Sequence, residues 1–410
     1  MSAVEALGID ERHYLDTCRS ACRYVELGSC GEAAEGFDGS QGPWYKQDMA
    51  SWLNPEEDAL FFLEREMAGI FAITESHLLD GRVRFKGTLL VDPGKAVAEL
   101  TERLVPHGYY PLLRGEEDLT ILRVMPSKRP FRSGPWLNIL LLLATLVTTV
   151  FVGATNRGAH PLANPWSVVQ GLPFALTLLS ILGVHELGHY FTARQYGITV
   201  TLPYFIPAPI GLGTFGAFIK MKSPVTDRRA LFDVGIAGPL AGLCVALPAI
   251  VVGLRWSELI LTGSAGHVGI ALGTPLMFSL LQWLTLGPLP QGGDVLLHPV
   301  AFAGWIGLLV TALNLLPIGQ LDGGHIAYAL VGKHHRKVAI FALIVLVGMG
   351  TLYWPGWLFW ASLSLILGLK HPPPLNDVTP LDKRRRLVGF ASLLLLLSVI
   401  TPSPFSFSEP

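Results

Sequence analysis

Long apolar runs occupy most of the chain beyond Pro135. An α-helix needs about 20 predominantly apolar residues to cross a lipid bilayer, and seven of these runs approach that length. The pattern therefore predicts a polytopic α-helical membrane protein with spans at residues 136–154, 167–193, 230–254, 298–317, 337–352, 355–369 and 387–401. A further apolar stretch, 269–286, is interrupted by Gly and Pro, so we expect it to lie at the interface or to re-enter.

A different pattern lies between the second and third predicted spans. Residues 201–220 are rich in Pro, Gly and β-forming side chains, so they cannot form a transmembrane helix. We interpret them as a re-entrant β-hairpin whose edge strand, Thr214 to Ile219, could add a strand to an unwound segment of another polypeptide. A plain interfacial loop is the alternative.

Before Pro135 the pattern is that of a soluble protein. Residues 1–66 indicate a polar, partly helical lead-in broken by a glycine-rich stretch. Residues 67–126 predict a small α+β domain of order β-α-β-β, with one helix and three strands. The remaining divisions are a linker at 127–135, a transmembrane domain at 136–401 and a tail at 402–410.

Composition supports this division. Half of the residues are hydrophobic and 15% are charged, which is too apolar for an ordinary soluble protein. Residues 1–134 hold 15 Lys and Arg against 22 Asp and Glu, whereas residues 135–410 hold 15 against 9. The four cysteines are too few for a disulfide-stapled secreted domain, and no basic stripe with interleaved aromatic residues indicates nucleic-acid binding.

The basic residues orient the predicted spans. With the N-terminus inside, sixteen Lys and Arg fall on the inner side and two fall outside. The segment Met1 to Asp16 has no apolar core of a signal peptide and is not an Arg-rich transit peptide. We therefore expect an N-terminal domain in the cytosol and a bacterial cytoplasmic membrane, although a mature plastid protein would look the same.

Three acidic residues, Glu186, Asp233 and Asp322, lie within or beside the apolar runs, where an ionisable side chain is costly and therefore a candidate for function. Glu186 belongs to an H-E-x-x-H motif. His185 and His189 are four residues apart, so on a helix both imidazoles can bind one zinc ion (Zn2+). Glu186 is then close enough to act on water at the metal without binding the metal itself.

A catalytic zinc usually has three protein ligands and one open position. Asp322 is the best candidate for the third ligand because Pro317 and the following glycines break the helix before it. A helix cap is the alternative role for Asp322. Asp233, which is close in sequence to Arg228 and Arg229, is more typical of a paired carboxylate at a helix entry.

Taken together, the His185-Glu-Leu-Gly-His189 helix, then Asn314 with Pro317, then Leu321-Asp322-Gly323 resemble the site-2 protease family of intramembrane zinc metalloproteases. The resemblance covers at least residues 136–325. It implies that His185, His189 and Asp322 bind zinc, that Glu186 is the general base and that Asn314 stabilises the reaction intermediate. The N-terminal domain and the last span resemble the bacterial and chloroplast branch of that family.

The resemblance implies hydrolysis of peptide bonds in membrane-spanning protein substrates within the lipid bilayer, as in regulated intramembrane proteolysis. Asn314 could instead form only an interhelical hydrogen bond. A polytopic transporter or channel that uses Glu186, Asp322 and the histidines as a proton or metal relay is the alternative function. The pattern specifies neither a substrate sequence nor an oligomeric state.

Weaker signals remain open. Cys18, Cys22 and Cys30 are expected to be free thiols. His325 could orient a metal ligand or cap a helix. The basic runs at 334–337 and 383–386 are expected to anchor the inner membrane surface.

Overall fold

The computed structural model describes residues 55–79, 82–116, 119–126, 134–261 and 270–407. The chain forms two compact units, Met1–Arg129 and Pro130–Pro410, which are described separately below. The predicted lead-in up to residue 54, with Cys18, Cys22 and Cys30, lies outside the described residues.

The first unit is an antiparallel sheet with helices, in the strand order β1-β2-β4-β3. Its core contains Phe85 and Leu122 of the sheet, with Leu100 and Leu104 of a helix. The helical spacing of the last two explains why this helix packs by one face. The elements are α4 (Pro55–Glu66), β1 (Phe71–Leu79), β2 (Arg82–Leu89), α5 (Pro93–Leu104), β3 (Tyr109–Glu116) and β4 (Leu119–Pro126).

The prediction of one helix and three strands for residues 67–126 omits one strand, β1, whereas its single α-helix is α5. Strand β1 was missed because it lies at the sheet edge and its middle, Thr74 to Ser76, is polar and exposed, which hides the alternation. Helix α4 lies in the segment 1–66, which the sequence indicated to be polar and partly helical, and its Leu63 is buried in the core.

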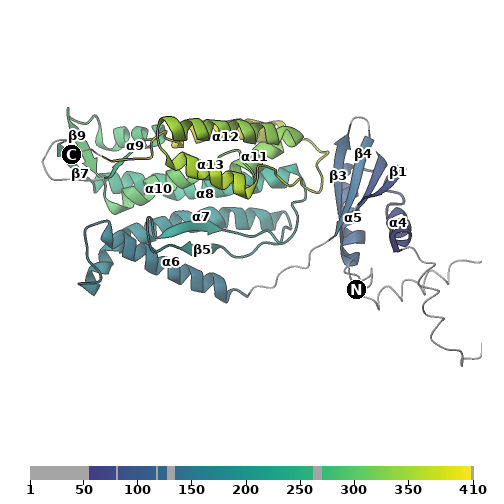
Figure 1. Ribbon diagram of the computed structural model, residues 1–410, viewed down its shortest axis with the longest axis horizontal. Helices are drawn as coiled ribbons and strands as arrows, with labels where there is room; N and C mark the ends of the chain where they lie inside the picture. Colours follow the sequence, from purple (N-terminus) through teal and green to yellow (C-terminus); the bar gives the residue numbers. More distant parts are fainter. Residues whose placement is uncertain (1–54, 80–81, 117–118, 127–133, 262–269, 408–410) are drawn as a thin grey trace, which may run out of the picture. The chain divides into compact units, whose positions relative to one another are not determined.

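In the second unit, a helix occupies each of the seven places where the apolar runs predicted a span. Four helical segments, 136–155, 165–195, 228–255 and 322–352, are long and apolar enough to cross a membrane, and others are shorter. The helices lie side by side with roughly aligned axes (Figure 1). They are α6 (Trp136–Thr155), α7 (Leu172–Gln195), α8 (Arg228–Arg255), α10 (Pro299–Asn314), α12 (His335–Leu352), α13 (Gly356–Leu367) and α14 (Lys383–Val399).

The centre of this unit is the packing of α7, α8 and α10. Buried side chains from all three meet there, including Phe174, Ile250 and Trp305. Where α8 crosses α10, a Cβ on Gly253 would lie 2.2 Å from the backbone nitrogen of Ala301, so only glycine permits this approach. This contact brings α8 and α10 close together, and both pack against α7, the helix that carries His185 and His189.

Two short strands connect α7 to α8. Strands β5 (Tyr204–Pro207) and β6 (Thr214–Phe218) form an antiparallel hairpin, in the region where the sequence predicted one. The stretch 269–286 contains β8 (Ile270–Leu272) and α9 (Leu276–Leu286). Helix α9 has 11 residues, so it rises only about 17 Å, roughly half of a hydrocarbon core.

Further strands of this unit pair in twos. Strand β7 (Glu258–Leu261) pairs with β9 (Gly293–Leu296), and β8 pairs with β10 (Phe405–Phe407) near the end of the chain. The indole N–H of Trp357 donates to the Pro402 carbonyl at 2.8 Å, which ties the last described residues to α13.

The segment between α13 and α14, residues 368–382, packs across other elements of the unit. Asp377 receives hydrogen bonds from Arg228 of α8 at 2.7 Å and from Tyr328 at 2.9 Å. Tyr328 belongs to α11 (Asp322–Val331), which precedes α12. His371 of the same segment is also buried. We call residues 368–382 the strap.

Candidate metal centre

Helix α7 brings His185 and His189 to one face. Their side chains are buried, and their Nε2 atoms lie 3.2 Å apart. The spacing of four residues places them one turn apart, as the sequence predicted. Both imidazoles point toward α8 and α11 rather than toward the exposed side of the unit.

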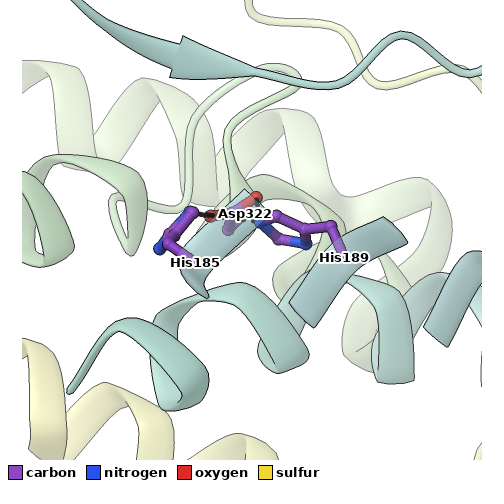
Figure 2. A group of neighbouring side chains, drawn as sticks. All are labelled: His185, His189 and Asp322. Atoms are coloured by element: carbon purple, nitrogen blue, oxygen red, sulfur yellow. Dashed lines mark hydrogen bonds and ion pairs between the residues drawn. The ribbon is translucent and has the colours of Figure 1, made fainter. Parts of the chain in front are cut away.

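Asp322 meets these histidines from the start of α11. Its Oδ2 lies 3.2 Å from His185 Nε2, and its Oδ1 lies 3.3 Å from His189 Nε2 (Figure 2). Helix α10 ends at Asn314, and the chain turns through Pro317 before α11 begins. A Cβ on Gly323 would lie 2.0 Å from the Leu315 carbonyl oxygen, so glycine is required for this tight return.

The spacing of the three ligand groups fits zinc. Two ligand atoms bound tetrahedrally at zinc, each about 2.0–2.1 Å from the ion, stand about 3.3–3.4 Å apart. Here the two imidazole Nε2 atoms are 3.2 Å apart, and each lies 3.2 or 3.3 Å from a different oxygen of the Asp322 carboxylate. His185, His189 and Asp322 are also the cluster that meets the geometric requirement for a metal site within the described part of the chain.

A hydrogen bond selects the tautomer of His189. Its Nδ1 lies 2.7 Å from the Val234 carbonyl oxygen of α8, which can only accept, so Nδ1 carries the proton. Nε2 of neutral His189 therefore presents a lone pair toward His185 and Asp322. Lone pairs and a carboxylate that converge on one point favour the binding of a cation. This charge arrangement, together with the spacing of the ligand atoms, indicates that these residues fit a metal ion.

Glu186 lies beside the three ligands without joining them. Its side chain is buried, and its Oε1 is 3.9 Å from His185 Nε2. The backbone N–H of Ile219, next to strand β6, lies beside the Glu186 carboxylate and interacts favourably with its negative charge. The general base predicted from the motif is thus held between the metal ligands and the hairpin.

Asn314, the last residue of α10, also reaches this centre. Its Nδ2 lies 3.2 Å from His185 Nε2, with the side chain partly buried. All five residues named from the sequence, His185, Glu186, His189, Asn314 and Asp322, therefore lie together. Their catalytic roles remain predictions.

The sequence reasoning missed the contribution of α8. A Cβ on Gly238 would lie 2.0 Å from His189 Nε2, and one on Gly242 would lie 3.2 Å from His185 Cβ. These two glycines give the imidazoles the space that they occupy. Their spacing of four residues in an apolar helix is the small-xxx-small pattern of close helix packing, which could have identified them.

Two other expectations have clear outcomes. Asp233 is paired, as expected, but not with the nearby Arg228. Its partners are Arg385 of α14, at 2.6 Å, and the Tyr196 hydroxyl. Arg228 instead forms an ion pair with Asp377 of the strap. His325 does not cap a helix with its side chain: its Nδ1 lies 2.6 Å from Nε2 of His371 in the strap.

Comparisons with known proteins point to one family. Residues 173–354 match the model of peptidase family M50. The chain is 29% identical to the probable zinc metalloprotease EGY2, chloroplastic, of Arabidopsis thaliana, over 82% of this chain and 63% of that protein. It is 36% identical to the probable zinc metalloprotease EGY1, chloroplastic, of the same plant, over 57% of this chain and 43% of that protein.

This chain thus matches 43% to 63% of the length of these relatives. Their names place them in chloroplasts, so they give no support to the predicted bacterial membrane. No solved structure matches the chain significantly.

Proposed function

Since the chain belongs to peptidase family M50, the site-2 protease family, we propose that it is a zinc metalloprotease that hydrolyses peptide bonds of membrane-spanning protein substrates. One observation carries the proposal. His185, His189 and Asp322 converge at zinc-compatible separations beside a buried Glu186, within a bundle of apolar helices.

The residues have distinct tasks in this reaction. His185, His189 and Asp322 would hold the metal. Bound zinc supplies a Lewis acid and makes water a nucleophile near neutral pH. Glu186 accepts the proton of the attacking water and returns it to the leaving amine. The Asn314 amide donates a hydrogen bond to the oxygen that becomes negative during attack.

A substrate helix must unwind before its peptide bond can be attacked, because its carbonyls are hydrogen-bonded within the helix. Strand β6 offers a partner for the unwound segment. Its Phe215 and Phe218 are 73% and 46% exposed, and the chain contacts Glu186 directly after the strand, at Ile219. Addition of a substrate strand to β6 would therefore place the substrate next to the general base.

We further propose that all seven helices at the predicted places cross the membrane, with the hairpin re-entering it. The basic residues then lie mainly on the inner side, together with the N-terminal α+β domain. In this arrangement the domains divide as the sequence indicates: the soluble domain ends near residue 126, and the protease domain spans 136–401.

A transporter or channel is the weaker explanation. A relay needs ionisable groups in series along a path, whereas His185, His189 and Asp322 all meet at one point. That arrangement suits a bound metal ion better than a moving one.

Cleavage by the purified chain in lipid vesicles tests the proposal. The substrate is a single-span polypeptide whose apolar segment is interrupted by Gly and Pro. Replacement Glu186→Gln keeps the shape but removes the base, so kcat should fall by a factor of about 10²–10⁴. Glu258→Gln, on exposed strand β7, is the matched control. Equal cleavage by wild type and Glu186→Gln would refute the proposal.

A further inference from the structure

The β5–β6 hairpin is attached to α6 at its base by a side-chain amide. Asn138, in the first turn of α6, is buried, and its Nδ2 donates to the carbonyls of Leu202 at 2.8 Å and Pro203 at 3.0 Å. Both N–H groups of the amide are therefore used. The two carbonyls come directly before β5, so this contact fixes the start of the strand.

A second attachment lies at the turn of the hairpin. The Thr148 hydroxyl lies 2.7 Å from the Gly213 carbonyl, closer than it lies to carbonyls of its own helix. The backbone is also in close contact here: a Cβ on Gly213 would lie 2.5 Å from the Thr149 Cα, and Gly213 has a φ of +82°. Only glycine fits this approach and this conformation.

These two attachments prevent the hairpin from sliding along α6. Asn138 and Thr148 are ten residues apart, which corresponds to about 15 Å of helix rise. Strand β5 runs between them and packs against α6 (Figure 1). With both ends bonded, a shift of β5 along the helix axis would break both contacts.

Because β6 pairs with β5, the position of β5 on α6 also fixes the position of β6 beside Glu186. It pairs with β5 in a defined register, with Tyr204 opposite Phe218 and Phe205 opposite Ala217. Strand β6 packs against α7, and the backbone N–H of the next residue, Ile219, lies beside the Glu186 carboxylate. The position of the hairpin on α6 therefore determines which part of β6 stands beside the reacting groups.

We propose that Asn138 and Thr148 are positioning residues that set the register in which β6 presents an extended substrate to Glu186, and so select the peptide bond that is cut. The inference rests on the proposed proteolysis. Side chains alternate along a strand, so a slip by two residues preserves the faces of the substrate and changes only the bond presented. Loosening the attachments should therefore produce cuts two residues away from the normal one.

The test uses the full chain in lipid vesicles with the same Gly- and Pro-interrupted polypeptide. Thr148→Val removes the hydroxyl at constant shape, Asn138→Leu removes the amide, and Thr148→Ser retains the hydroxyl. Thr145→Val is the matched control, because the buried Thr145 hydroxyl bonds to the Leu141 carbonyl of its own helix at 2.7 Å. Product masses, kcat, KM and zinc content are measured on each sample.

We expect Thr148→Val and Asn138→Leu to retain zinc, to lose about tenfold in kcat with a smaller change in KM, and to yield an additional product two residues away. Thr148→Ser and Thr145→Val should cut as wild type does. A single unchanged cut with control-level kcat in the variant that combines Asn138→Leu with Thr148→Val would overturn the inference. Loss of zinc together with activity in the single variants would also overturn it. Failure of wild type to cleave would overturn the proposed function itself.

Discussion

At the scale of single residues, the metal centre depends on the space that α8 leaves for the histidines. Gly238→Ala would place a methyl carbon 2.0 Å from His189 Nε2, where the packed backbone of α8 cannot move away. We expect this variant to lose most of its zinc, measured by metal analysis of the purified protein. Gly183→Ala in α7, whose new methyl would meet Phe205 at 3.7 Å, is the control. Full zinc content in Gly238→Ala would contradict this account.

The charge of Asp322 is the second requirement at this scale. Asp322→Asn preserves the shape of the side chain but removes the negative charge that faces both imidazoles. Zinc should therefore be lost to a chelator at concentrations at least about tenfold lower than for wild type. Asp294→Asn on strand β9 makes the same chemical change away from the centre. Identical chelator curves for Asp322→Asn and wild type would exclude Asp322 as a ligand.

Sequence could identify the residues of the centre but not all of their surroundings. His185, Glu186 and His189 form a local motif, and Asp322 is conspicuous because few carboxylates occur beyond residue 134. The Val234 carbonyl that selects the His189 tautomer has no sequence signal, since every residue carries a carbonyl. Such a contact depends on the crossing of α7 and α8, which only the fold specifies.

At the scale of elements, the strap is held by neutral histidines. His371 is buried between His325 of α11 and His335 of α12, with its ring stacked on Tyr328, whose hydroxyl binds Asp377. Burial, followed by the neighbouring His325 and His335, lowers the pKa of His371 to about 3. As pH falls below the ordinary histidine pKa, about 6.5, the unfolded chain binds a proton that the folded strap excludes.

The stability contributed by neutral His371 is therefore present above pH 6.5 and is lost as the pH falls toward 3. When the pH is lowered from 7 to 5, the protonation of this one group in the unfolded chain should lower the free energy of unfolding by about 2 kcal/mol. Denaturant unfolding of the detergent-solubilised chain at the two pH values measures it. His371→Phe should remove most of that difference, whereas His160→Phe, at an exposed position, should not. An equal pH dependence in both variants would contradict the prediction.

The elements themselves were predictable where one physical requirement dominates. Each predicted span contains a helix, because long apolar runs have few alternatives to helical structure. The hairpin was predictable because Pro and Gly exclude a helix between 201 and 220. The packing of the strap against α8 and α11 was not predictable. Its polar residues are typical of an ordinary loop, and their partners, Arg228 and Tyr328, are far away in the sequence.

At the scale of the whole molecule, chemistry and the soluble domain belong to different units. All five site residues lie in Pro130–Pro410, and none lies in the unit that ends at Arg129. A chain without residues 1–126 should retain zinc and cleave the simple model polypeptide within about twofold of the full chain, because all five site residues and the helices that hold them belong to the other unit. Comparison of the natural membrane proteins cleaved by the two forms then measures substrate selection by the soluble domain. Loss of zinc from the shortened chain would contradict this division.

The distance along the chain between the ligands has a consequence for synthesis. His189 and Asp322 are 133 positions apart, on α7 and α11, so the centre closes a long loop of the polypeptide. During translation the two histidines reach the membrane well before the carboxylate. The proposed protease therefore lacks its third metal ligand while its first spans are being inserted. Nascent chains arrested before Pro317 should fail to retain zinc, and chains arrested far enough beyond Val331 for α11 to leave the ribosome should retain it.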